Sequence, residues 1–190
     1  TKKFVLFGTD KSLPDGRIIA TKGEAGFQAK TLAPGIYFGF WPWQYEITLE
    51  NFTVIPQGKI GLISAKDGLG RNVDSDNFQD AEKFLNNNGN KGRQSTVLVS
   101  GSYRINKFLF DVSITDQITI NDNAVGIVTT LDGMPLSEGQ IAADTATGHN
   151  KFQDFNLFLE NKGQRGLQQE VILAGTYNIN PWAVIIEEVK

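Results

Sequence analysis

The residues best spaced for metal chemistry form an acidic run, Asp74-x-Asp76-x-x-x-Asp80-x-Glu82. Carboxylates at short intervals are the ligands that Ca²⁺ takes in loop sites. This run lacks both the glycine that makes the sharp turn of such a loop and the bidentate glutamate that closes it. The matching stretch later in the chain keeps only Asp154. Helix capping and a solvated face therefore explain these acids better, and we expect no bound metal and no cofactor.

A single histidine, His149, limits the catalytic chemistry open to the chain. One imidazole cannot form a cage of several histidines, and a Ser-His-Asp triad would have to use it. Ser137 and Asp144 lie nearby in sequence, but in an expected loop without the pattern that exposes a nucleophilic serine. Glu46 and Glu50 alternate with apolar residues and fit the solvent side of a strand. We predict no catalytic residues.

Composition sets the broad class of the protein. The chain has 190 residues, of which 40% are apolar, and its net charge is −3 with 18 lysines and arginines spread out. Binding of nucleic acid relies on clustered cations that neutralise phosphates, so nucleic acid is not expected as a partner. The sequence contains no cysteine, which excludes disulfides and thiolate metal sites. No apolar stretch approaches the length of a membrane-spanning helix.

A motif that occurs three times organises the rest of the sequence. Each copy reads Gly-x-Gln, six further residues and then Gly-x-Tyr, and the second halves are Gly35-x-Tyr37, Gly101-x-Tyr103 and Gly175-x-Tyr177. We expect these glycines to adopt positive φ in turns, and each tyrosine to place its ring in a core. The glutamine amides, like those of Asn106 and Asn180, fit side-chain hydrogen bonds to the backbone of a loop or turn.

The last two copies agree over a longer stretch, which predicts a duplicated module. Phe78-Gln79-Asp80 matches Phe152-Gln153-Asp154, and Phe84-Leu85 matches Phe158-Leu159. Tandem modules of this kind bury a face that a neighbouring copy completes, which favours a scaffold over an enzyme. The predicted segments are a partial β module at 1–51, a β/α module at 52–116 and a further β/α module at 117–190.

Local patterns predict a β-dominated α+β fold of antiparallel hairpins, with one short helix on each complete module. An apolar stripe at helical spacing predicts a helix over 77–87 with Asp76 as its cap, and the later copy predicts one over 151–161 with Asn150 as its cap. A short strand or helical turn is expected near 139–145. Strands are expected at 2–7, 17–21, 36–41, 44–54, 59–65, 95–100 and 103–114, in a strand–turn–strand unit at 118–131, and at 170–174 and 177–189.

The densest aromatic cluster of the chain spans 38–45 and contains Phe40, Trp41 and Trp43. Tryptophan and tyrosine favour the headgroup region of a membrane, so these three residues are candidates for a membrane or partner contact. The other interpretation is that half of the rings in this cluster fill the core of the first module.

The repeated turn resembles a known family. Leu32-Ala33-Pro34-Gly35-Ile36-Tyr37 looks like the Pro-Gly turn and following strand of band 7 proteins, the superfamily of stomatin, prohibitin and flotillin. The third copy carries the fuller form, Gly166-Leu167-Gln168 followed by 173–181, with Ala174 where a proline often precedes the glycine. Ile60–Ile63 and Val125–Thr129 resemble the strand that opens the family's domain.

The resemblance implies a non-enzymatic scaffold at a membrane. Band 7 proteins generally reach a membrane through a hydrophobic N-terminal segment and assemble side by side. We therefore expect a soluble fragment of a longer protein, which contacts the membrane through segments outside this chain and self-associates in its full-length context. The alternative is an extracellular or surface β-repeat that binds a polysaccharide or a protein through exposed aromatic residues.

Overall fold

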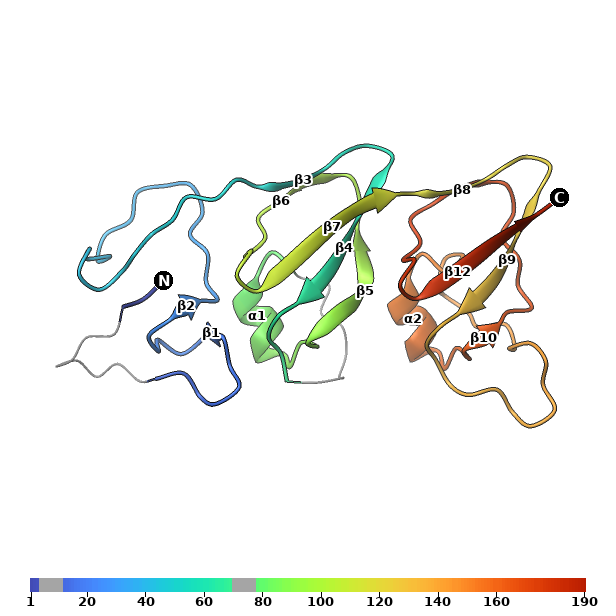
Figure 1. Cartoon of the computed structure of the whole chain (residues 1–190), viewed down its shortest axis with the longest axis horizontal. Helices are drawn as coiled ribbons and strands as arrows, with labels where there is room; N and C mark the ends of the chain where they lie inside the picture. Colours follow the sequence, from blue (N-terminus) through green and yellow to red (C-terminus); the bar gives the residue numbers. More distant parts are fainter. Residues whose placement is uncertain (4–11, 70–77) are drawn as a thin grey trace. The chain divides into compact units, whose positions relative to one another are not determined.

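The computed structural model describes residues 1–3, 12–69 and 78–190 (Figure 1). These residues divide into two compact units. The first comprises 1–54, 63–94 and 102–112, and the second comprises 55–62, 95–101 and 113–190. Below, repeat 1, repeat 2 and repeat 3 denote the predicted segments 1–51, 52–116 and 117–190. Their boundaries stay predictions, since the two units do not follow the three segments one to one.

The described residues form twelve short strands and two short helices, which confirms the β-dominated α+β class. Neither helix is long and apolar enough to cross a membrane. The elements are β1 (Ile19–Ala20), β2 (Phe27–Gln28), β3 (Thr53–Ile55), β4 (Lys59–Ala65), α1 (Ala81–Asn86), β5 (Gly92–Leu98), β6 (Gly101–Tyr103), β7 (Phe110–Asp116), β8 (Ile118–Ile120), β9 (Val125–Thr130), α2 (Phe155–Glu160), β10 (Gly166–Leu167), β11 (Gly175–Tyr177) and β12 (Val184–Val189).

Repeats 2 and 3 contain the same elements in the same order and with the same pairing (Figure 1). The strand orders β5-β4-β7 and β10-β9-β12 place the second strand of each repeat at the centre of a three-stranded sheet. The first strand pairs with the fourth, as β3-β6 and β8-β11. In repeat 3, β9 is antiparallel to both β10 and β12. The duplication seen in the sequence is therefore a duplication of topology.

Both helices begin at an aspartate of the matched Phe-Gln-Asp stretches. The Asp80 side chain accepts a hydrogen bond from the backbone N–H of Lys83, and the Asp154 side chain accepts one from Leu157. Such a cap satisfies a backbone donor that the first turn of a helix leaves free. The prediction of Asn150 as a cap is wrong, because residues 150–152 have positive φ and precede the helix. The other predicted cap, Asp76, lies outside the described residues.

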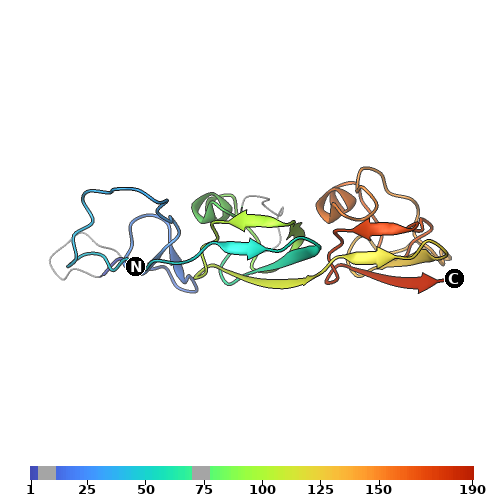
Figure 2. The same ribbon diagram turned by 90° about the horizontal axis from the view of Figure 1, so that it is seen from above.

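The core of the second unit lies between α2 and the β10-β9-β12 sheet, and Figure 2 shows the helix on one side of the strands. Phe158 is fully buried, and its ring centroid lies 5.1 Å from that of Phe155 and 5.6 Å from that of Phe152. Gly163 lets the chain pass close to this ring, since a Cβ there would lie 2.4 Å from Phe158. In the first unit Phe84 is equally buried, with its ring 4.9 Å from Phe110. The apolar stripe that predicted each helix is therefore buried at these two phenylalanines.

Several strand predictions for repeat 1 are wrong. Residues 36–41, all described, form no strand, and residues 44–54 contribute only an isolated bridge at Tyr45 and the start of β3. Apolar alternation is present there, but a strand also needs a neighbour to accept its backbone hydrogen bonds. The expected element near 139–145 is likewise no strand or helix, only a parallel bridge from Ala143 to Gln168. Of the strand expected at 2–7, residues 4–7 lie outside the described residues.

Replacing Phe158 by alanine is expected to lower the free energy of unfolding by about 3–5 kcal/mol, because it leaves a cavity between helix and sheet. Chemical denaturation followed by far-UV circular dichroism measures the change. The neighbouring Leu157 is 39% exposed, so Leu157→Ala serves as the control and should cost roughly 1 kcal/mol or less. Equal midpoints for Phe158→Ala and wild type would contradict the buried role of Phe158.

Candidate functional site

The glutamine of each motif copy closes its own turn in the same way. The Nε2 atom of Gln28, Gln94 and Gln168 donates to the carbonyl oxygens of the residues two and four positions earlier. These distances are 3.0 and 2.8 Å for Gln28, 2.8 and 2.8 Å for Gln94, and 2.9 and 2.7 Å for Gln168. The predicted bond from a glutamine amide to a loop backbone is confirmed in all three copies.

The first glycine of each motif allows this turn to form. Gly26, Gly92 and Gly166 have φ of +129°, +100° and +109°, a region that side chains with a Cβ rarely adopt. The second glycines differ among the copies: Gly101 and Gly175 have positive φ, with values of +157° and +148°, but Gly35 does not. The prediction of a positive-φ turn at Gly35 is therefore wrong.

A second amide links each later repeat to the repeat before it. In the first unit, Asn106 Nδ2 donates to the carbonyl oxygens of Gln28 and Ala29, both at 3.0 Å. In the second unit, Asn180 Nδ2 donates at 2.9 Å to the carbonyl oxygen of Ser95, the residue after Gln94. We call these contacts the amide junctions. The turn bonds predicted for the two asparagines are present as well, since their Oδ1 atoms accept from the backbone N–H two residues later.

Repeat 1 carries Trp41 where the later repeats carry the junction asparagine. The carbonyl oxygen of Trp41 accepts from the N–H groups of Gln44 and Tyr45, at 2.8 and 2.9 Å. The Asn180 carbonyl accepts from the residues three and four positions later in the same way, both at 3.0 Å. An indole has one N–H donor and no acceptor, so it cannot make both bonds of the asparagine amide. The face of repeat 1 at this position is therefore aromatic.

The rings around Trp41 are exposed. Trp41 and Trp43 are 54% and 65% exposed, and their rings stack with centroids 5.1 Å apart. Phe38 is 90% exposed, and Phe40 is also exposed and meets the Tyr45 ring edge-on at 5.0 Å. The interpretation that half of these rings fill a core is wrong. Trp41, Trp43 and Phe40 are called the aromatic face below.

The repeated tyrosines do not share one environment. Tyr177 is buried, and its hydroxyl donates to the Leu173 carbonyl at 3.0 Å. Tyr103 is half-buried, and Tyr37 is 45% exposed. The prediction of one core ring per repeat is therefore met in full by repeat 3 alone.

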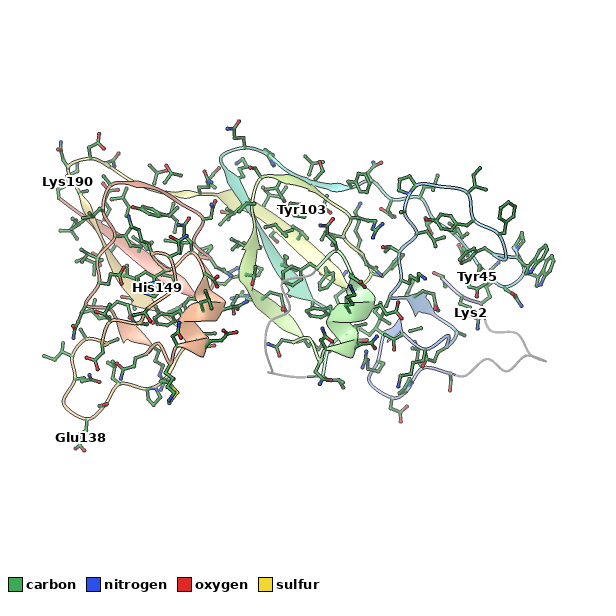
Figure 3. The ribbon with its side chains drawn as sticks, turned by 180° about the vertical axis from the view of Figure 1, so that it is seen from behind. Lys2, Tyr45, Tyr103, Glu138, His149 and Lys190 are labelled. Atoms are coloured by element: carbon green, nitrogen blue, oxygen red, sulfur yellow. The ribbon has the colours of Figure 1, made fainter. Side chains whose placement is uncertain are left out.

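His149 is a structural residue of the turn before α2 and lies inside the second unit (Figure 3). Its Nδ1 accepts from the backbone N–H of Phe152 at 2.9 Å, and its Nε2 lies 3.0 Å from the Ala146 carbonyl and 3.4 Å from the Glu170 carboxylate. The Asp144 carboxylate accepts instead from the side chain of Gln140. Both ring nitrogens of His149 thus have partners outside a Ser-His-Asp arrangement.

The acidic residues also have structural roles where they are described. Asp80 caps α1, Glu82 lies in its first turn, and Asp74 and Asp76 lie outside the described residues. Within the described residues, no group of three or more histidine, cysteine or acidic side chains could hold a metal ion. An open hollow of about 470 Å³ beside β9 is lined by Thr130, Leu131, Pro135, Leu136, Arg165 and Gly166, of which only Arg165 is charged.

Asp67 joins repeats 1 and 2 through a buried carboxylate that sequence analysis missed. Its oxygens accept from the N–H groups of Ile18 and Ile19 at 2.9 and 3.0 Å, and lie 3.1 and 3.2 Å from Arg17 Nε. Burial raises the pKa of Asp67, but the two backbone hydrogen bonds and the charge of Arg17 together lower it below its usual value. The matching Asp132 is exposed, so the motif copies gave no signal of this role.

Comparison of the chain with protein-family models, curated proteins and solved structures finds no match. The band 7 resemblance therefore stays a prediction from the sequence.

Replacing Asn180 by aspartate is expected to destabilise the protein by about 1–3 kcal/mol at neutral pH, because a carboxylate oxygen would face the Ser95 carbonyl. Chemical denaturation measures the loss. Asn178→Asp is the matched control, since Asn178 Oδ1 accepts from Gln117 Nε2 and a carboxylate keeps that bond. Equal losses in the two variants would contradict the amide junction.

Asp67 is expected to make stability depend on acidic pH. Because its pKa is lower in the folded state, its contribution is complete above the unfolded pKa of about 3.9 and is lost as pH falls through the lower folded value. The difference in unfolding free energy between wild type and Asp67→Asn should therefore shrink between about pH 5 and pH 2. Denaturation at several pH values tests this, and a constant difference would contradict it.

Proposed function

We propose that this chain is a non-enzymatic scaffold segment of a membrane-associated, band 7-like protein that supports lateral self-association. The observation that carries the proposal is the amide junction, which occurs twice in the same form at Asn106 and Asn180. In each junction the asparagine amide of one repeat donates to a backbone carbonyl at or next to the motif glutamine of the preceding repeat. This bond holds the two repeats together. Modules joined in this way build an extended framework in which each contacts only the next.

The side chains that could do chemistry are used to hold this framework. His149 orders the turn before α2, Asp80 and Asp154 cap the two helices, and Asp67 joins repeat 1 to repeat 2. Use of these groups in packing supports a scaffold, because catalytic groups need to face a substrate.

The aromatic face supports contact with a membrane. Tryptophan rings favour the headgroup region of a bilayer, and Trp41 and Trp43 present two stacked rings to solvent. Lys3 lies beside them, with its Nζ atom 3.3 Å from the Pro42 carbonyl, and adds a cation that anionic lipids attract. Such a contact is weak by itself, but it becomes effective when another segment already holds the protein at the membrane.

Lateral association is tested by tethering the chain to vesicles through a terminal histidine tag and nickel-chelating lipid. The chain should sediment as a monomer in dilute solution, and dye-labelled copies should show energy transfer once tethered, because tethering raises their effective concentration. A labelled, inert protein of similar size at the same surface density is the control. Energy transfer no higher than that control would contradict the scaffold proposal.

Membrane contact gives a separate prediction. Removing both stacked rings, as Trp41→Ala with Trp43→Ala, should weaken binding of the untagged chain to vesicles of phosphatidylcholine and phosphatidylserine by about tenfold, or 1.4 kcal/mol. Vesicle sedimentation measures the binding. Leu131 and Ile141 are exposed apolar residues elsewhere, so Leu131→Ala with Ile141→Ala is the matched control and should bind like wild type. Equal binding by all three proteins would contradict the membrane contact, and loss of polysaccharide binding with the tryptophans would favour the ligand-binding alternative.

A further inference from the structure

Repeat 1 has two open backbone edges that carry exposed apolar side chains. The first edge is 35–37, where Ile36 is 86% exposed, and the second is 47–50, which begins after the mutual backbone bonds of Glu46 and Thr1 and where Ile47 and Leu49 are 56% and 94% exposed. Neither segment belongs to a strand of the described structure. Both edges have counterparts in repeat 3, where neighbouring strands pair with them.

Lys2 occupies in repeat 1 the place that Thr130 occupies in repeat 3. Thr130 is the last residue of the central strand β9 and pairs with Gly166 on one side and Val184 on the other. Lys2 forms antiparallel bridges to Gly26 and Tyr45 in the same way, and Lys2 and Tyr45 are labelled in Figure 3. Gly26 opens the motif as Gly166 does.

The next residue confirms the register. Lys3 N–H donates to the Gln44 carbonyl at 2.7 Å, and Leu131 N–H donates to the Ala183 carbonyl at 2.8 Å. Residues 1–3 of the chain therefore occupy the places of 129–131.

In repeat 3 the corresponding edges are covered by β8 and by the rest of β9. β8 pairs with β11 in the register Gly175↔Ile120 and Tyr177↔Ile118, and β9 pairs with β12 up to Val189. The difference in burial follows from this cover. Tyr177 is 6% exposed, against 45% for Tyr37 at the matching position.

We propose that the two edges of repeat 1 bind a strand–turn–strand segment of the same type as Ile118–Val128, with its second strand running in line into Thr1. The first strand of this segment pairs with 35–37 and the second with 47–50, next to the existing pair of Glu46 and Thr1. Its side chains at the positions of Ile120 and Val128 are apolar, because both residues are buried in the core of repeat 3.

The segment that binds these edges also needs a glycine at the position equivalent to Gly126. In repeat 3 a Cβ at Gly126 would lie 2.6 Å from Ile120 Cδ1 and 2.8 Å from Ile186 Cγ2. Ile47 is the counterpart of Ile186, so the same close approach is expected there. This inference is independent of the proposed membrane contact, which concerns the aromatic face.

The test is a fusion protein in which a copy of Ile118–Val128 directly precedes Thr1. Hydrogen exchange of the backbone amides at 36–37, 48 and 50 should slow at least tenfold relative to the unfused chain, because strand pairing protects amides from exchange and alternate amides after Glu46 face the added strand. A rise in the melting temperature should accompany the protection.

Two matched fusions serve as controls. One carries a single extra glycine between the segment and Thr1, which shifts the register and turns the apolar side chains to the wrong face. The other carries Ile120→Ser and Val128→Ser in the fused copy alone. Unchanged exchange in the fusion with the unaltered Ile118–Val128 copy would overturn the proposal. Equal slowing in that fusion and in both controls would overturn it as well. Slow exchange at 48 and 50 in the unfused chain, together with a sedimenting dimer, would overturn it in favour of a second copy as the occupant.

Discussion

One side-chain amide per repeat replaces the backbone pairing that such short strands cannot provide. Gln94 and Gln168 are nearly fully buried, so their amide groups must find partners inside the protein. Each glutamine amide donates to the carbonyl oxygens of the residues two and four positions earlier. These two hydrogen bonds fix the path of the backbone through the turn. The positive φ of the motif glycine is the backbone condition for that path. The junctions between repeats start from this turn.

The same turn also prepares the contact between repeats. Once the glutamine has fixed the turn, the carbonyl groups that follow it face the asparagine of the next repeat, as Ala29 faces Asn106 and Ser95 faces Asn180. Each asparagine is in turn held by the backbone two residues later, so its amide has one orientation. Order within one repeat thus sets the geometry of its contact with the next repeat.

Features that depend on nearby residues could be predicted from the sequence. The buried phenylalanines of both helices and the limits of β4 follow from local spacing, and the recurring Gln and Asn indicated amide bonds to backbone. Features that depend on distant partners could not. The alternation at 44–54 predicts a strand, yet it becomes one only where a neighbouring strand is present. The partner of Asn106 lies more than seventy residues away, and the buried Asp67 has an exposed counterpart.

Replacement of the junction asparagine by Trp41 bears on how copies could assemble. An array of repeats has unlike ends, so copies stacked end to end would need an amide on one end and free carbonyl groups on the other. Repeat 1 presents stacked indoles instead of that amide, and they cannot both donate to a carbonyl and accept from their own turn. A further amide junction at the position of Trp41 is therefore disfavoured. The aromatic face is left for a different kind of surface, which fits the chemistry of Trp41 and Trp43 better than a carbonyl partner does.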